Sequence, residues 1–212
     1  MKTNHIFIFC DNHEEVVNEL LAFGFMEGSN RIHPNQGTQN RKFYFNDFFI
    51  EILWVHNFDE IQNERSKKSK LYERAEHKTN TCSAFGLCLN YSKEEDELFE
   101  NCYKYKPSYI PSNMFIEVLK NEDSPSLPWT FRWQTSGTKL KINEPINFSK
   151  QKLSKIIFGI KKKTIENNYL ELFNNDEVFF EDSKEEFVKL IFTKSDDKKA
   201  HFFESLNLII EY

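Results

Sequence analysis

The pattern of hydrophobic and polar residues along positions 1–56 predicts a strand, then a helix, then further strands. Residues 5–10, HIFIFC, are rich in aromatic and β-branched side chains, as in a strand. The next segment repeats apolar residues at helical spacing, namely Val16, Val17, Leu20, Leu21 and Phe23. Gly24 ends this predicted helix. Extended runs follow at 25–26, 41–46 and 48–54, with a turn at Asn46 and Asp47. Residues 1–56 therefore predict a βαβββ module.

The rest of the chain repeats this order less regularly. Residues 57–81 are strongly charged and predict a polar helical linker. Within 82–150 we expect a second, irregular module with a strand at 84–89, a helix at 93–103 and strands at 114–119 and 129–134. Within 151–212 we expect a third module with a strand at 154–160, a helix at 164–173 and strands at 177–182, 186–193 and 205–212. The pattern indicates an α+β protein built from repeated βαβββ modules.

Composition and charge narrow the class of partner. Hydrophobic residues make up 39% of the 212 positions and aromatic residues 16%, which excludes a disordered chain. A net charge of −5 gives no electrostatic reason to expect nucleic acid or an anionic membrane. No apolar run reaches the roughly 18 residues of a membrane span, and the N-terminal apolar stretch is too short for a signal peptide. We therefore expect a cytoplasmic protein that binds a small molecule.

Two residues interrupt an otherwise apolar strand pattern in the first module. Glu51 shares a strand face with Phe49 and Leu53, where an unpaired charge would cost several kcal/mol. It must therefore be paired, protonated or bound to a metal. His5 begins the first strand, and an imidazole with a carboxylate on a neighbouring strand could form half of a divalent-metal site. The alternative is an ordinary strand-end histidine that is satisfied by hydrogen bonds.

The segment 31–41, RIHPNQGTQNR, is the other unusual feature, because it gathers polar side chains next to the Glu51 strand: His33, Thr38, Asn40 and Arg41. Loops of this kind often carry function. The alternative is a plain turn in which Pro34 and Gly37 set the backbone angles. Spacing alone leaves both interpretations open.

These pieces together resemble a known family. HIFIF, a helix ending in LLAFGF, the run H-P-x-x-GT-x-NR and the strand FFIEILW resemble, in order and spacing, the glyoxalase-like branch of the vicinal oxygen chelate superfamily. The resemblance implies that βαβββ modules pair and curl into a curved, half-open mixed β-barrel with flanking helices around a small-molecule pocket. It leaves open a homodimer and a chain that closes its own barrel.

The resemblance also implies a metal site. His5 and Glu51 fall on the two ligand positions of the first module, and Glu211 stands near an equivalent position in the third. The second module departs from the family pattern, because Phe85 or Gly86 occupies the place of a ligand. One divalent metal ion on these residues would support lyase, isomerase or dioxygenase chemistry. Glu51 is in addition the candidate catalytic base.

The alternative function is a non-catalytic protein that binds or sequesters a small molecule and has a degenerate metal site. In either case we expect the same residues to contact the substrate or ligand: His33, Thr38, Asn40, Arg41, Trp54, Arg132 and Trp133.

Overall fold

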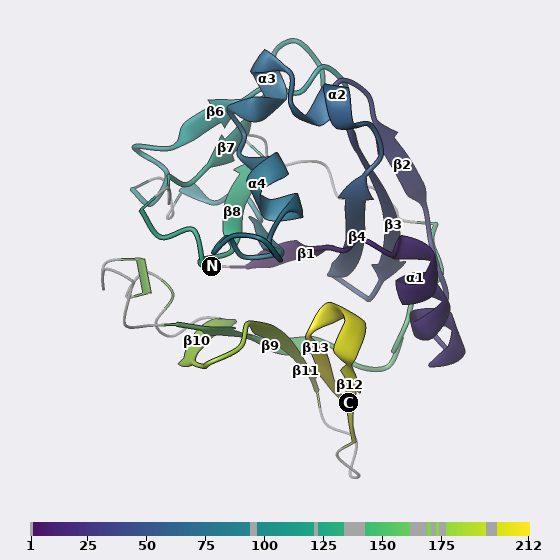
Figure 1. Cartoon of the computed structure of the whole chain (residues 1–212). Coiled ribbons are helices and arrows are strands. Elements are labelled where there is room, and N and C mark those ends of the chain that lie inside the picture. Colours follow the sequence, from purple (N-terminus) through teal and green to yellow (C-terminus); the bar gives the residue numbers. More distant parts are fainter. Residues whose placement is uncertain are drawn as a thin grey trace.

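The structure is a computed structural model of the chain. It describes residues 2–93, 97–120, 123–133, 143–161, 169–170, 173, 177–193 and 199–212. Figure 1 shows a curled sheet above a second, smaller sheet, with the short helices of the linker inside the curl at its top. The predicted α+β class and its curved, half-open sheet are confirmed.

The larger sheet contains eight strands in the order β2-β3-β4-β1-β5-β8-β7-β6. Their bounds are Thr3–Phe9 (β1), Asn30–His33 (β2), Thr38–Tyr44 (β3), Phe49–Val55 (β4), Phe85–Leu89 (β5), Tyr103–Tyr105 (β6), Ile116–Val118 (β7) and Trp129–Trp133 (β8). In each half, the first strand runs parallel to the last: β1 beside β4, and β5 beside β8. The halves join through the antiparallel pair β1 and β5. Two modules therefore form one continuous sheet.

Helices fill the connections. The first, α1 (His13–Ala22), buries Val16, Val17 and Leu20 and ends before Gly24, whose positive φ of 103° suits a residue without Cβ. The linker forms the short helices α2 (Phe58–Ile61), α3 (Glu64–Lys67) and α4 (Leu71–Ala75). Although this segment is highly charged, Leu71 and Arg74 are buried. The linker is therefore packed against the sheet rather than solvated throughout.

The second sheet contains five strands in the order β10-β9-β11-β13-β12. Their bounds are Leu153–Ile160 (β9), Val178–Asp182 (β10), Phe187–Phe192 (β11), Ala200–Phe203 (β12) and Leu208–Glu211 (β13), with a 3-10 turn, η3, at Glu204–Leu206. Its centre repeats that of the large sheet, because antiparallel β9 and β11 are each flanked by a parallel strand, β10 and β13. This pairing differs from the strand order of the first module.

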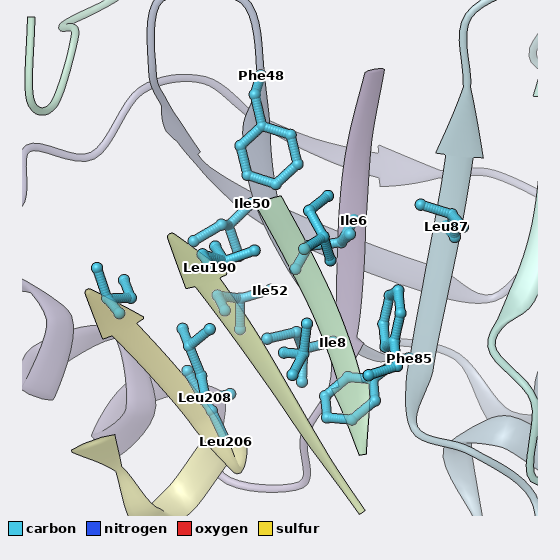
Figure 2. Close-up of a cluster of buried hydrophobic side chains, with 14 of the residues drawn as sticks. Ile6, Ile8, Phe48, Ile50, Ile52, Phe85, Leu87, Leu190, Leu206 and Leu208 are labelled. Atoms are coloured by element: carbon cyan, nitrogen blue, oxygen red, sulfur yellow. The ribbon is translucent and has the colours of Figure 1, made fainter. Parts of the chain in front are cut away.

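The main core lies between the two sheets. In Figure 2, Ile6, Ile8, Ile50 and Ile52 of the large sheet face Leu190 and Leu208 of the small sheet and Leu206 of η3, and all are at most 3% exposed. Fully burying one such side chain contributes about 1.5–3 kcal/mol. Because side chains alternate along a strand, the odd-numbered residues of β1 point the other way, into the curl. Residues 6–9 of the first strand are apolar without interruption because both faces of the strand are covered there.

Some predicted elements differ from the structure. The predicted helix at 93–103 has turns at its described residues 97–101, and Tyr103 begins β6 instead. Tyr105 explains the change, since its buried hydroxyl donates to Gln36 across the curl and draws the segment into the sheet. Strands β2 and β12 were not predicted, and residues 25–26, predicted as an extended run, do not form a strand. The predicted helix at 164–173 lies mostly outside the described residues.

The half-buried carboxyl group of Glu186 joins the two sheets, and its titration should make the stability of the protein depend on pH. Glu186, just before β11, accepts hydrogen bonds from the Ser83 hydroxyl and from the Ala84 backbone N–H at 3.3 Å, and burial raises its pKa to about 7. Because the folded pKa lies above the unfolded one, its favourable contribution is complete at acidic pH and is lost as the pH rises through 7. We expect the unfolding free energy of Glu186→Gln, relative to that of the wild type, to increase by about 1–2 kcal/mol as the pH rises from about 5 to about 8.

Urea unfolding of both proteins across this pH range measures the difference between their unfolding free energies. Because the other titrating groups are the same in both proteins, their contributions cancel in that difference. Glu185→Gln, at the exposed neighbouring position, is the control and should follow the wild-type profile. A constant difference between Glu186→Gln and the wild type at all pH values would contradict the prediction.

Candidate functional site

A cavity of about 160 Å³ lies inside the curl of the large sheet, and Leu71 of α4 and Tyr109 are among the residues that line it. Its polar lining residues are Asn4, His5, Arg31, His33, Gln36, Asn40, Lys42 and Glu51. Its remaining lining residues are Phe7, Phe49, Leu53, Leu71, Tyr109, Ile116, Trp129, Phe131 and Trp133. The cavity therefore combines aromatic walls with polar groups contributed mainly by β1 to β4.

Glu51 is the central polar residue. It lies on β4 with its side chain on the inner face, beside Phe49 and Leu53, as the strand pattern predicted. The Asn40 side-chain N–H donates to its Oε1, and His5 Nε2 lies 3.5 Å from its Oε2. Burial raises the pKa of Glu51, while Lys42, Asn40 and Arg31 partly oppose that shift. The carboxyl group can therefore exchange a proton more readily near neutral pH than an exposed one.

His5 is held as a neutral ring. Its Nδ1 lies 2.8 Å from Asn4 Oδ1, an oxygen that can only accept, so Nδ1 carries the proton and Nε2 presents a lone pair toward Glu51. The ring stacks on Phe49 at 4.2 Å between centroids. Burial, with a smaller effect of Lys42, lowers its pKa to about 3. His5 and Glu51 therefore do not form an ion pair at neutral pH.

The turn between β2 and β3 supplies a second polar group. His33 Nδ1 lies 2.8 Å from Thr38 Oγ1, which also accepts from Gln36 Nε2 at 2.8 Å. Gln36 Oε1 in turn accepts from the hydroxyls of Tyr105 and Tyr109 at 3.1 Å and 3.0 Å. Burial lowers the pKa of His33 to about 3. The segment 31–41 thus forms a tight hairpin whose turn is braced by the second half of the sheet.

Of the residues predicted for the site, the structure brings six together here: His5, Glu51, His33, Asn40 and Trp133 line the cavity, and Thr38 holds His33. Sequence reasoning missed Arg31, Gln36, Lys42 and Tyr109. Lys42 could have been found, because it alternates with Asn40 along one strand face.

Three other predicted residues lie outside this cavity. Arg41 points to the opposite side of β3 from Asn40 and pairs with Glu27. Trp54 lies three positions after Glu51 on β4 and therefore faces the other side of the strand. There it stacks on His13, with 4.0 Å between ring centroids. Arg132 donates to Glu117 at 2.7 Å on the face of β8 opposite Trp133. Neighbouring strand positions face opposite sides, which separates these residues from the site.

Glu211 is also placed elsewhere. It lies in β13 of the second sheet, where its carboxylate is 3.5 Å from Lys189 Nζ, and it does not line the cavity.

The donors present do not fit a tightly held divalent ion. His5 Nε2 and Glu51 Oε2 could share one, but the described part of the chain contains no cluster of three or more His, Cys, Asp or Glu side chains that could hold a metal. Lys42 adds a cation beside the same carboxyl group. Structural and catalytic zinc sites draw on three or four protein ligands. No step of the chemistry below therefore depends on a metal.

Comparison with known proteins identifies the fold. No family model matches the sequence, and no curated protein matches it. A crystal structure of a hypothetical protein from Staphylococcus aureus matches with a TM-score of 0.63 at 16% identity, covering 99% of this chain and 98% of that one. This chain shares that fold. The likeness extends over both sheets, since nearly the whole of each chain is aligned.

Weaker matches cover one part of the chain. Streptomyces coelicolor methylmalonyl-CoA epimerase aligns with 65% of this chain and 99% of its own at 14% identity, with a TM-score of 0.41. The hypothetical protein BH1468 from Bacillus halodurans aligns with 65% of this chain at 12% identity and a TM-score of 0.42. At these scores we draw no conclusion from them. No helix among the described residues is long and apolar enough to span a membrane.

Proposed function

We propose that this chain is a glyoxalase-like protein of the vicinal oxygen chelate type that binds a small molecule inside the curled sheet, and that Glu51 transfers a proton to or from it. The paired modules and the sequence resemblance support the family. The observation that supports the chemistry is the buried Glu51 carboxyl group, fixed by Asn40 on the wall of the cavity. A positioned carboxyl group with a raised pKa is the type of group that serves as a general acid or base.

The residues around Glu51 have separate tasks in this proposal. Glu51 accepts a proton from a carbon next to a carbonyl group, and the electron pair of that C–H bond moves to the carbonyl oxygen. Lys42 and Arg31 stabilise the negative charge that develops there. Return of the proton at another position completes an isomerisation, and loss of a leaving group completes an elimination. Neutral His5, stacked on Phe49, lies beside the carboxyl group, and its lowered pKa keeps it from competing for the proton.

The test is hydrogen exchange in heavy water. Small carbonyl carboxylates, beginning with pyruvate, 2-oxobutanoate and acetoacetate, are incubated with the protein, and deuterium uptake at carbon is followed by proton NMR. We expect uptake from at least one compound, with Glu51→Gln slower by about 100-fold or more, the usual size of one general-base contribution. Glu14→Gln, on the exposed first turn of α1, is the control with unchanged activity.

Equal exchange rates for Glu51→Gln and the wild type would overturn the assignment of Glu51. A stoichiometric transition metal that is lost in His5→Ala would overturn our conclusion about the donor set.

A second candidate function is a non-catalytic binding or sequestering protein. The small number of metal ligands among the described residues favours it, because a pocket of this kind can bind a small molecule without a metal. Ligand binding without any deuterium uptake, for all compounds that bind, would support this function over the first.

A further inference from the structure

The balance of charge in the cavity favours an anionic ligand. Glu51 is the sole carboxyl group among the described lining residues, and burial raises its pKa toward the neutral form. Lys42 and Arg31 are the cations that line the same cavity, and His5 and His33 are neutral. No ion pair involves Lys42 within the described part of the chain, and its Nζ lies 5.7 Å from the centroid of the Phe49 ring. A bound anion would supply its missing partner.

The side-chain oxygen of Asn40 lacks a hydrogen-bond donor among the described residues. Its side chain is 1% exposed, and its Oδ1 is a buried oxygen for which the described residues provide no partner. Its orientation is fixed, because Nδ2 donates to Glu51, and exchanging the amide atoms would turn oxygen toward the carboxylate oxygen. An unsatisfied buried acceptor costs about 1–3 kcal/mol. A hydroxyl or N–H of the ligand would remove that cost.

Size and shape limit the ligand further. The cavity of about 160 Å³ is close to the roughly 150 Å³ of an apolar cavity that accommodates benzene. Flat side chains form much of its wall, among them Phe49, Trp129, Phe131 and Trp133. Rings favour stacked or edge-to-face contacts with other rings. The ligand is therefore about the size of one six-membered ring.

We infer that the cavity binds a single-ring-sized carboxylate that also carries a hydroxyl or N–H group, with the carboxylate at Lys42 and Arg31 and the donor at Asn40 Oδ1. This inference deepens the proposed function, since it concerns the ligand of the same cavity. It makes Asn40 the residue that selects the ligand, separately from the proton transfer by Glu51.

Matched pairs of small probes test it. Binding of benzoate and of the three monohydroxybenzoates is measured by isothermal titration calorimetry, with phenol as a neutral probe. We expect one hydroxybenzoate to bind at least 10-fold more tightly than benzoate, because a site built around a polar group rejects analogues that leave that group unpaired. Phenol should bind more weakly than that hydroxybenzoate.

Variants separate the proposed carboxylate contact at Lys42 from the proposed donor contact at Asn40. Asn40→Leu, which is close to isosteric, should reduce the preference for the hydroxylated probe to less than 2-fold. Lys42→Met should weaken the binding of benzoate and of the preferred hydroxybenzoate at least 5-fold and leave the binding of phenol unchanged. Lys152→Met, at an exposed position outside the cavity, should bind all probes like the wild type. Because Asn40 also contacts Glu51, Glu51→Gln serves as a second variant and should keep the hydroxyl preference.

The outcomes distinguish this inference from the proposed function. Equal binding of benzoate and all hydroxybenzoates would overturn it and would indicate that water satisfies Asn40. Persistence of the preference in Asn40→Leu would overturn it too, and the wild-type comparison remains decisive if that variant does not fold. A hydroxyl preference without deuterium exchange supports the ligand class and contradicts catalysis, whereas exchange without the preference supports catalysis alone.

Discussion

Gly37→Ala is expected to destabilise the protein by about 3 kcal/mol or more. Gly37 has a φ of +78°, and a Cβ built there would lie 2.3 Å from the Ile61 backbone nitrogen and 2.4 Å from the Asn57 carbonyl oxygen. Both obstacles are backbone atoms at α2, so no side chain can rotate away. The Gly37 carbonyl also accepts from the backbone N–H groups of His56 and Asn57. The hairpin turn and the start of α2 therefore cannot separate without losing these bonds.

The control is Gly24→Ala, which shares the positive φ but would place its Cβ in open space. Backbone strain alone should cost it about 1–2 kcal/mol. Urea unfolding gives the loss of stability in each variant. The difference between the two losses is the cost of the clash with α2, because both variants carry the backbone strain. We also expect Gly37→Ala to weaken ligand binding, because the same turn carries His33 and Gln36 on the cavity wall. Equal losses of stability in the two variants would show that the contact with α2 is not tight.

Arg74→Met is expected to cost about 3 kcal/mol of stability, because a buried acceptor that loses its donor costs about 1–3 kcal/mol and several carbonyl groups lose this one. Arg74 is 3% exposed, and its Nη1 donates to the backbone carbonyls of Ser83, Pro125 and Leu127. Methionine keeps the length of the side chain and can pack in the same space, but it leaves these carbonyl groups without that donor. The loss comes from the acceptors that lose this donor rather than from a cavity, and the Pro125 carbonyl keeps its hydrogen bond from the Ser83 backbone N–H.

Arg65→Met makes the same chemical change at an exposed position of α3 and is the matched control. Its unfolding free energy should stay within about 0.5 kcal/mol of the wild type. Because Arg74 anchors α4, which carries Leu71 of the cavity wall, we also expect weaker binding of the probe carboxylates. If Arg74→Met unfolds like Arg65→Met, water has replaced the guanidinium and α4 is not anchored by it.

Candidate residues were predictable where they broke a strong local pattern. His5 and Glu51 stood out because a charged or polar group in an apolar strand needs a specific reason, and both line the cavity. The alternation that identified Glu51 could also have excluded Trp54, which lies at an odd distance from it along β4 and so faces the other side. We named it on residue type, and residue type does not decide the face.

Other site residues depended on long-range contacts. Tyr109 reaches the cavity because its hydroxyl donates to Gln36, a residue 73 positions earlier. Arg31 joins it through a contact between its Nη2 and the Tyr109 carbonyl oxygen at 3.4 Å. No spacing in the sequence reports such a pair, since the two segments meet only when the sheet curls. This part of the cavity wall was therefore not predictable.

The sequence by itself determined the α+β class, most strands and the helix α1, because each of these follows from the local period of apolar residues. It also determined that Glu51 is buried on an apolar face. Only the tertiary structure decided how the strands pair, where the charged linker packs and which polar residues share the cavity. These features depend on contacts between distant segments and on which face of each strand the curl encloses, and a local pattern carries no information about either.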